Sequence, residues 1–152
     1  MVLVTSWGDF EAQAPDLAAF GARRLTAALA YLATLRRVGT PRVHPISPII
    51  GNGRLFVFME PTSPKGGDLR ERHWYALHNG VPDTFGTGGE LLVSGQAMLI
   101  DDPDLRTIAS GAAGYQPEER YILFELDVNE VRCNGYGDVP LPEPRRWLFS
   151  QG

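Results

Sequence analysis

The sequence predicts a mainly β protein, built as one small antiparallel barrel with helices outside the sheet. The 17 glycines and 12 prolines divide the 152 residues into short segments, as in all-β proteins. Most of these segments alternate apolar and polar residues with a period of two, and hairpin-type turns join them. Since 43% of the residues are apolar and 21% are charged, the chain can bury one core, and we treat residues 1–152 as a single domain.

Charge and cysteine content exclude several classes of function. The formal net charge of −4 disfavours binding to nucleic acid or to an anionic membrane surface. Cys133 is the only cysteine, which excludes an intrachain disulfide and a zinc site made of several thiolates. Residues 1–11 lack the pattern of a secretory signal, and no apolar run is long enough to span a membrane. We therefore expect a cytoplasmic protein.

The first expected element is a helix that begins at Pro15. Proline suits the first turn of a helix, and apolar residues follow Pro15 at helical spacing as far as Leu32. The polar face of this helix carries Arg23, Arg24 and Thr26, which are expected to face water.

A period of two then predicts strands over residues 31–35 and 42–50. Pro45 and Pro48 lie inside the second of these segments and cannot donate a hydrogen bond to a neighbouring strand. The second strand is therefore expected at a sheet edge, at a bulge or at an opening of the barrel.

The Gly51-Asn52-Gly53 turn predicts a hairpin whose return strand, 54–59, is apolar on both faces and belongs in the middle of the sheet. The further expected elements, in chain order, are a helix over 64–71, strands over 74–78 and 91–100, a helix from Asp102-Pro103 and a strand over 121–131.

Residues 121–131 alternate Ile122, Phe124 and Leu126 with acidic residues, so Glu125 and Asp127 are expected on a solvent-facing side of the last strand. The tail from Gly135 has no period. Its Trp147 is interpreted as a cover for the barrel, with closure over a ligand as the alternative.

The clearest candidate site is the start of the helix expected at Pro64. Ser63 can cap that helix, and the amide groups of a first helical turn attract anions. Lys65 adds a positive charge, and the glycines at 66–67 would let a ligand approach the backbone. Arg42 could add a forked contact to a phosphate. The alternative is an ordinary surface helix with a solvated Lys65.

Four segments occur in a fixed order along the chain: residues 31–46, the hairpin leading to 55–58, the run 63–69, and Tyr75-Ala76-Leu77. In this order and spacing they resemble the pyridoxamine 5′-phosphate oxidase-like, flavin-binding split-barrel family. The resemblance implies a six-stranded antiparallel split β-barrel with flanking α-helices, a homodimer, and flavin mononucleotide (FMN) at each end of the interface.

Position by position, the resemblance implies a set of cofactor-binding residues. Arg42 would contact the phosphate, residues 43–47 would follow the isoalloxazine edge, and the 63–65 turn would hold the phosphate. The full set is Arg42, Val43, His44, Pro45, Ile46, Ser47, Phe58, Met59, Ser63, Pro64 and Lys65. Asp68 stands where relatives often carry a neutral amide, and Glu90 receives no role.

The implied function is two-electron transfer between FMN and a small organic substrate, with the flavin supplying the reactive atom. No catalytic side chain is assigned. Two alternatives remain open: a deazaflavin coenzyme on the same barrel, and a protein that carries or senses flavin or heme without turnover. His44, His73, His78 and Cys133 lack metal-ligand spacing, so no metal site is expected; His44 could bond a flavin or serve the fold alone.

Overall fold

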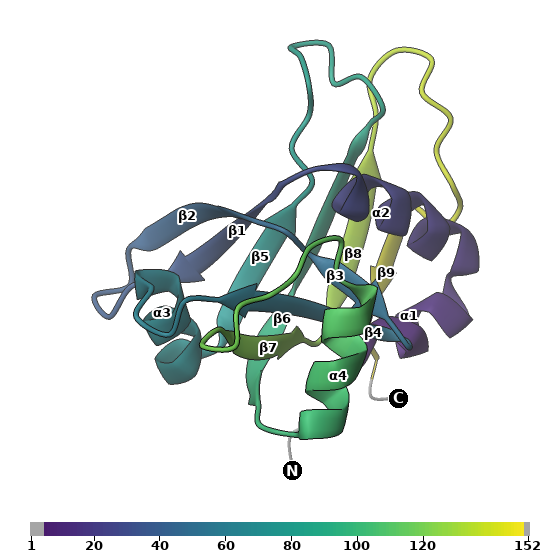
Figure 1. The fold of residues 1–152 in the computed structure, drawn as a ribbon. Coiled ribbons are helices and arrows are strands. Elements are labelled where there is room, and N and C mark those ends of the chain that lie inside the picture. The colour runs from purple at the N-terminus through teal and green to yellow at the C-terminus, as the bar shows by residue number, and fades with distance from the viewer. Residues whose placement is uncertain (1–4, 151–152) are drawn as a thin grey trace.

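The computed structural model describes residues 5–150 (Figure 1). Residues 1–4, the first part of the 1–11 segment in which no secretory signal is expected, lie outside the described residues. The helices are α1 (Trp7–Gln13), α2 (Pro15–Ala27), α3 (Pro64–Arg72) and α4 (Pro103–Ala112). The strands are β1 (Ala30–Leu35), β2 (Pro41–Ile46), β3 (Ile49–Gly51), β4 (Arg54–Met59), β5 (Trp74–His78), β6 (Glu90–Ile100), β7 (Ile122–Leu126), β8 (Glu130–Asn134) and β9 (Arg146–Leu148).

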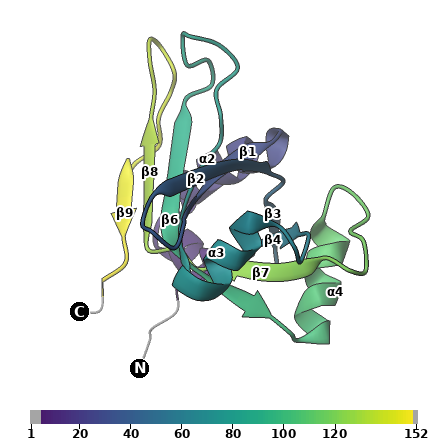
Figure 2. The ribbon, with the colours of Figure 1, turned by 90° about the vertical axis from the view of Figure 1, so that its left-hand side faces the viewer.

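The strands form one antiparallel sheet in the order β2-β1-β5-β6-β7-β4-β3. Outside this order, β8 pairs with β6, and β9 pairs with β8. Residues 90–96 of β6 pair with β5 and β8, whereas residues 97–100 pair with β7. The sheet therefore turns at β6 and curls into an open half-barrel, with α3 near the opening and α4 outside (Figure 2). The expected mainly β, antiparallel split barrel with flanking helices is confirmed, although the described sheet has nine strands rather than six.

Two of the long expected strands are each divided in two. Segment 42–50 breaks into β2 and β3 around Pro48, which fits the expected opening. Segment 121–131 breaks at Asp127, and the expectation of one continuous strand is wrong. At this break the Asp127 backbone N–H donates to the Gln96 carbonyl at 2.9 Å, and its carboxylate accepts from the Gln96 amide at 2.6 Å.

The expectation that Glu125 and Asp127 face water is also wrong, because only 1% and 3% of their surfaces are exposed. β7 lies between β6 and β4 and is packed on both faces. Glu125 is compensated by Arg54, whose Nη1 lies 2.5 Å from its Oε1. The alternation of polar and apolar residues was therefore a poor guide to which face meets solvent.

The core has two parts. The larger part fills the barrel and includes Trp7 and Phe10 of α1, a helix that the sequence analysis did not identify; Ser6 and Asp9 form its capping box. Trp147, on the short strand β9, packs 5.2 Å from the Phe10 ring and serves as the expected cover of the barrel. The smaller part lies between β4, β7 and α4.

Helix α2 begins at Pro15 as expected but ends at Ala27, and β1 follows almost directly. Arg23 and Thr26 face solvent. The expectation that Arg24 does so is wrong: its side chain is part-buried and its Nε donates to the Gly88 carbonyl at 2.6 Å. No helix within residues 5–150 has the length and apolar character needed to cross a membrane.

Candidate functional site

The start of α3 has the geometry that the sequence predicts. Ser63 adopts an extended conformation, and its Oγ accepts a hydrogen bond from the Gly66 amide at 3.2 Å. Pro64 has no N–H, and the Gly67 amide donates to the Ser63 carbonyl. Among the backbone N–H groups of residues 64–67, only that of Lys65 is left to donate to a ligand or to water. The turn at residues 63–65 therefore presents fewer free backbone N–H groups than a generic helix start.

Lys65 is half-buried at this turn and makes no hydrogen bond or ion pair with any residue between 5 and 150. The nearby carboxylate of Glu60 is occupied instead by Arg120, whose Nε lies 3.0 and 3.1 Å from the two oxygens. Burial lowers the pKa of Lys65, and the charge of Glu60 only partly opposes that shift. Lys65 is thus a partly desolvated cation without a direct partner.

The two glycines after Lys65 have different surroundings. A Cβ at Gly66 would lie 3.0 Å from Ser63 Oγ and 3.3 Å from Met59 Sδ, so the protein itself fills that space. A Cβ at Gly67 would meet nothing within 4 Å. Of these two glycines, Gly67 alone leaves space for a ligand to approach the backbone closely.

Arg42 is already paired. Its Nε donates to Asp68 Oδ2 at 2.8 Å, and Thr34 Oγ1 donates to the same oxygen at 2.7 Å. Arg72 Nη2 lies 3.2 Å from the other oxygen of Asp68. Burial alone would raise the pKa of Asp68, but the hydrogen bonds from Thr34, Arg42 and Arg72 outweigh it and lower the pKa. Asp68 therefore neutralises much of the charge that Arg42 was expected to offer a phosphate.

β2 forms the free edge of the sheet next to this site, because β1 is its sole strand partner in the described chain. The register places Val43 and Pro45 on the outer face and Arg42, His44 and Ile46 on the inner one. Ile46 is buried in the core, Ser47 is half-buried, and Val43, His44 and Pro45 are exposed. Backbone groups along the free edge are available to a ligand.

Phe58 and Met59 lie on opposite faces of β4. Met59 belongs to the barrel core beside Gly66, whereas Phe58 belongs to the outer cluster, with the Arg106 guanidinium 5.1 Å from its ring centre. Both are almost fully buried. Within the predicted set, the structure brings Met59, Ser63 and Lys65 together and connects Arg42 to α3 through Asp68. It does not bring Phe58 to the same face.

Scans against protein-family models and curated proteins give no match to this chain. Among solved structures, a heme binding protein from Mycobacterium smegmatis superposes with a TM-score of 0.62 and 20% identity, covering 78% of this chain and 55% of its own. A Listeria innocua protein, described as a candidate pyridoxamine 5′-phosphate oxidase, gives 0.60 and 12%, over 77% and 96%. The chain has the pyridoxamine 5′-phosphate oxidase-like split-barrel fold.

A third neighbour of this fold, from Bacteroides thetaiotaomicron, is described as a candidate 5-nitroimidazole antibiotic resistance protein. It gives a TM-score of 0.62 and 13% identity, covering 74% of this chain and 80% of its own. The present chain spans little more than half of the mycobacterial heme binding protein. At these identities the neighbours define the fold of the split barrel and leave its ligand open.

The outer face of the split barrel carries a group of exposed apolar side chains that the sequence analysis did not identify. Tyr31, Val43 and Trp74 project from β1, β2 and β5 on the same side of the sheet. The sequence predicted strands at all three positions but did not indicate which face of each strand would remain uncovered. These three side chains form an exposed apolar face of the sheet.

Proposed function

We propose that this split barrel binds FMN, with the phosphate at the turn formed by residues 63–65, and transfers two electrons to or from a small organic substrate. The observation that carries the proposal is the unpaired, half-buried ammonium of Lys65 beside a free amide. Desolvation of an uncompensated cation is unfavourable, and a phosphate would offset it with charge-assisted hydrogen bonds.

The other residues would complete the cofactor site in distinct ways. Ser63 fixes the turn, while the terminal nitrogens of Arg42, which have no partner among the described residues, could reach a phosphate oxygen. The free edge of β2 offers backbone groups to a planar ring, and Val43 and Pro45 offer apolar surface. A bound flavin supplies the redox chemistry, so the chain itself needs to bind, orient and exclude water.

A second copy of the chain is part of the proposal. The partner would cover Trp74 on the outer face of the sheet and would also close the space along β2. A cytoplasmic setting is also part of the proposal; it rests on the sequence, whose single cysteine leaves no intrachain disulfide for an oxidising compartment to form.

Absorption spectroscopy of the purified protein tests the cofactor directly. We expect a flavin spectrum, and mass measurement of the released chromophore separates FMN from a deazaflavin. Reduction of the bound flavin by a nicotinamide donor would support an enzyme over a carrier. A colourless protein that takes up neither flavin on titration would rule the proposal out.

Heme binding is a second candidate, favoured by the position of His44. Its Nδ1 lies 3.1 Å from the Pro45 carbonyl and its ring is exposed. An Nδ1–H that donates to a carbonyl leaves Nε2 unprotonated and free, an arrangement common among metal-ligating imidazoles. Titration with hemin, for the wild-type protein and for His44→Ala, tests this candidate. A Soret band that is lost in the variant would favour heme over FMN.

A further inference from the structure

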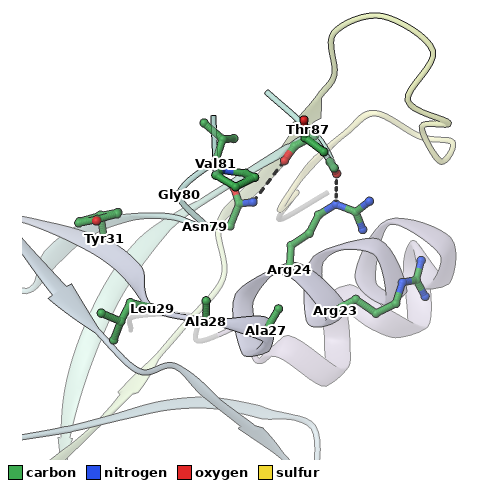
Figure 3. A pocket seen from close by; sticks show the side chains of 13 residues that line it. Arg23, Arg24, Ala27, Ala28, Leu29, Tyr31, Asn79, Gly80, Val81 and Thr87 are labelled. Atoms are coloured by element: carbon green, nitrogen blue, oxygen red, sulfur yellow. Dashed lines mark hydrogen bonds between the residues drawn. The ribbon is translucent and has the colours of Figure 1, made fainter. Parts of the chain in front are cut away.

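A hollow in the surface lies away from the 63–65 turn. It has a volume of about 670 Å³ and is bounded by the end of α2, the start of β1 and the loop that joins β5 to β6 (Figure 3). This size falls in the range of about 300 to 1,000 Å³ that is usual for small-molecule sites. None of the eleven predicted cofactor-binding residues lines it.

Three large apolar side chains are exposed around this one hollow. Leu29 is 54%, Tyr31 47% and Val81 38% exposed. Gly80 adopts a φ of +65°, and a Cβ there would lie 3.0 Å from the Tyr31 ring, so the ring packs against bare backbone. Side chains of this kind at a concave surface provide a wall that an apolar ligand would cover.

Two arginines from α2 stand at the rim. Arg24 is fixed: its Nε donates to the Gly88 carbonyl at 2.6 Å, its Nη1 to the Phe20 carbonyl at 3.0 Å, and its guanidinium carbon lies 3.3 Å from the centre of the Phe20 ring. Nη2 has no partner among the described residues. Arg23 is exposed and also lacks one within residues 5–150.

The electrostatics favour an anion at this rim. Burial lowers the pKa of Arg24, and the neighbouring charge of Arg23 lowers it further. The carboxylate of the β5–β6 loop, Asp83, is occupied by Thr87 and by the amide of Phe85, so it does not neutralise the pair directly. A ligand carboxylate would supply the missing negative charge.

We propose that this hollow is a binding site for an organic acid with an apolar body. The carboxylate would meet Arg23 and the free edge of Arg24, and the body would lie on Leu29, Tyr31 and Val81. An inorganic anion would leave the apolar wall exposed, and a neutral apolar molecule would leave the arginines uncompensated. The site shares no residue with the proposed FMN site, so either proposal can fail without the other.

Titration of the full chain with 2-naphthoate, followed by amide chemical shifts, tests the site. We expect the largest shifts at Gly80, Gly88 and Gly89, weaker binding at high salt, and weaker binding of the neutral analogue 2-naphthalenemethanol. Equal affinity for the acid and the alcohol, or shifts centred on Lys65 instead, would overturn the proposal.

Matched variants separate charge from apolar contact. Arg23→Met should weaken 2-naphthoate binding about threefold, whereas Arg37→Met, which removes another exposed arginine, should not change it. Leu29→Ser should weaken both naphthyl probes several-fold. Leu148→Ser, at a side chain of similar exposure (57%), should leave both unchanged. Equal losses in the test and control variants would overturn the proposal. All four variants lie at exposed positions and should fold.

Discussion

Arg42 and Lys65 were predicted to hold the same phosphate, yet their surroundings differ. Arg42 faces a buried carboxylate, Asp68, at 2.8 Å, and shares it with Arg72 and Thr34. Lys65 has no such partner among the described residues, because Arg120 occupies the nearby Glu60. The two cations therefore have different roles. Arg42, which is paired, contributes to the stability of the fold, and Lys65 remains available to a ligand.

The largest effect that separates the two roles is expected for Asp68→Asn. Losing the carboxylate leaves Arg42 without a counter-charge and leaves Arg72 with the exposed Glu71 alone. We expect a loss of about 2 kcal/mol in the free energy of unfolding at neutral pH. Because the pKa of Asp68 is lowered by folding, its contribution is present above the unfolded value near 3.8 and disappears as the pH falls through the folded value.

Urea unfolding at a series of pH values measures this effect. The wild type and Asp68→Asn should converge in strongly acidic solution, where both side chains are neutral. A difference in stability that stays constant across the pH range would contradict the assignment of a charged pair.

Lys65→Met should weaken FMN binding about tenfold, which corresponds to about 1.4 kcal/mol, with little change in stability. The expected loss follows from removing the Lys65 ammonium, which has no ion-pair partner among the described residues. Fluorescence titration of the flavin measures it, and Lys65→Arg serves as the control that retains charge. An unchanged dissociation constant in Lys65→Met would remove the phosphate assignment.

Arg42→Met should weaken FMN binding less, by about threefold, because Asp68 already offsets much of its charge. The same titration, done beside Lys65→Met, ranks the two cations. If Arg42→Met lost more affinity than Lys65→Met, the distinction between a structural and an available cation would be wrong.

Local signals in the sequence sufficed for most of the fold. Ser63-Pro64 and Asp102-Pro103 marked the starts of two helices, and Pro48 marked the interruption between strands β2 and β3. The sequence could not show that the Asp127 carboxylate would accept a hydrogen bond from the Gln96 backbone and interrupt a strand, because these residues are distant in the chain. Likewise, the α3 turn was predictable, but the pairing of Arg42 with Asp68 depends on which face of β2 turns inward.

The hollow near Arg24 was out of reach for the same reason. Arg23 and Arg24 occupy the polar face of a helix, where solvent exposure is the reasonable expectation. Only the fold of the β5–β6 loop places the Gly88 carbonyl against Arg24 and sets Val81 opposite Leu29.

The smallest effect concerns Asp127, a buried carboxyl group that, unlike Asp68, forms no ion pair with any residue between 5 and 150. Burial raises its pKa, the charge of Glu125 adds to that, and the hydrogen bond from Gln96 opposes it. Stability is therefore lost as the pH rises from the unfolded value near 3.8 through the folded value. Asp127→Asn, which can still accept from Gln96, should gain on the order of 0.5 kcal/mol at neutral pH and nothing in acid. Urea unfolding should thus give opposite signs for the two Asp→Asn variants, because Asp68 has cationic partners and Asp127 has none in the described part of the chain.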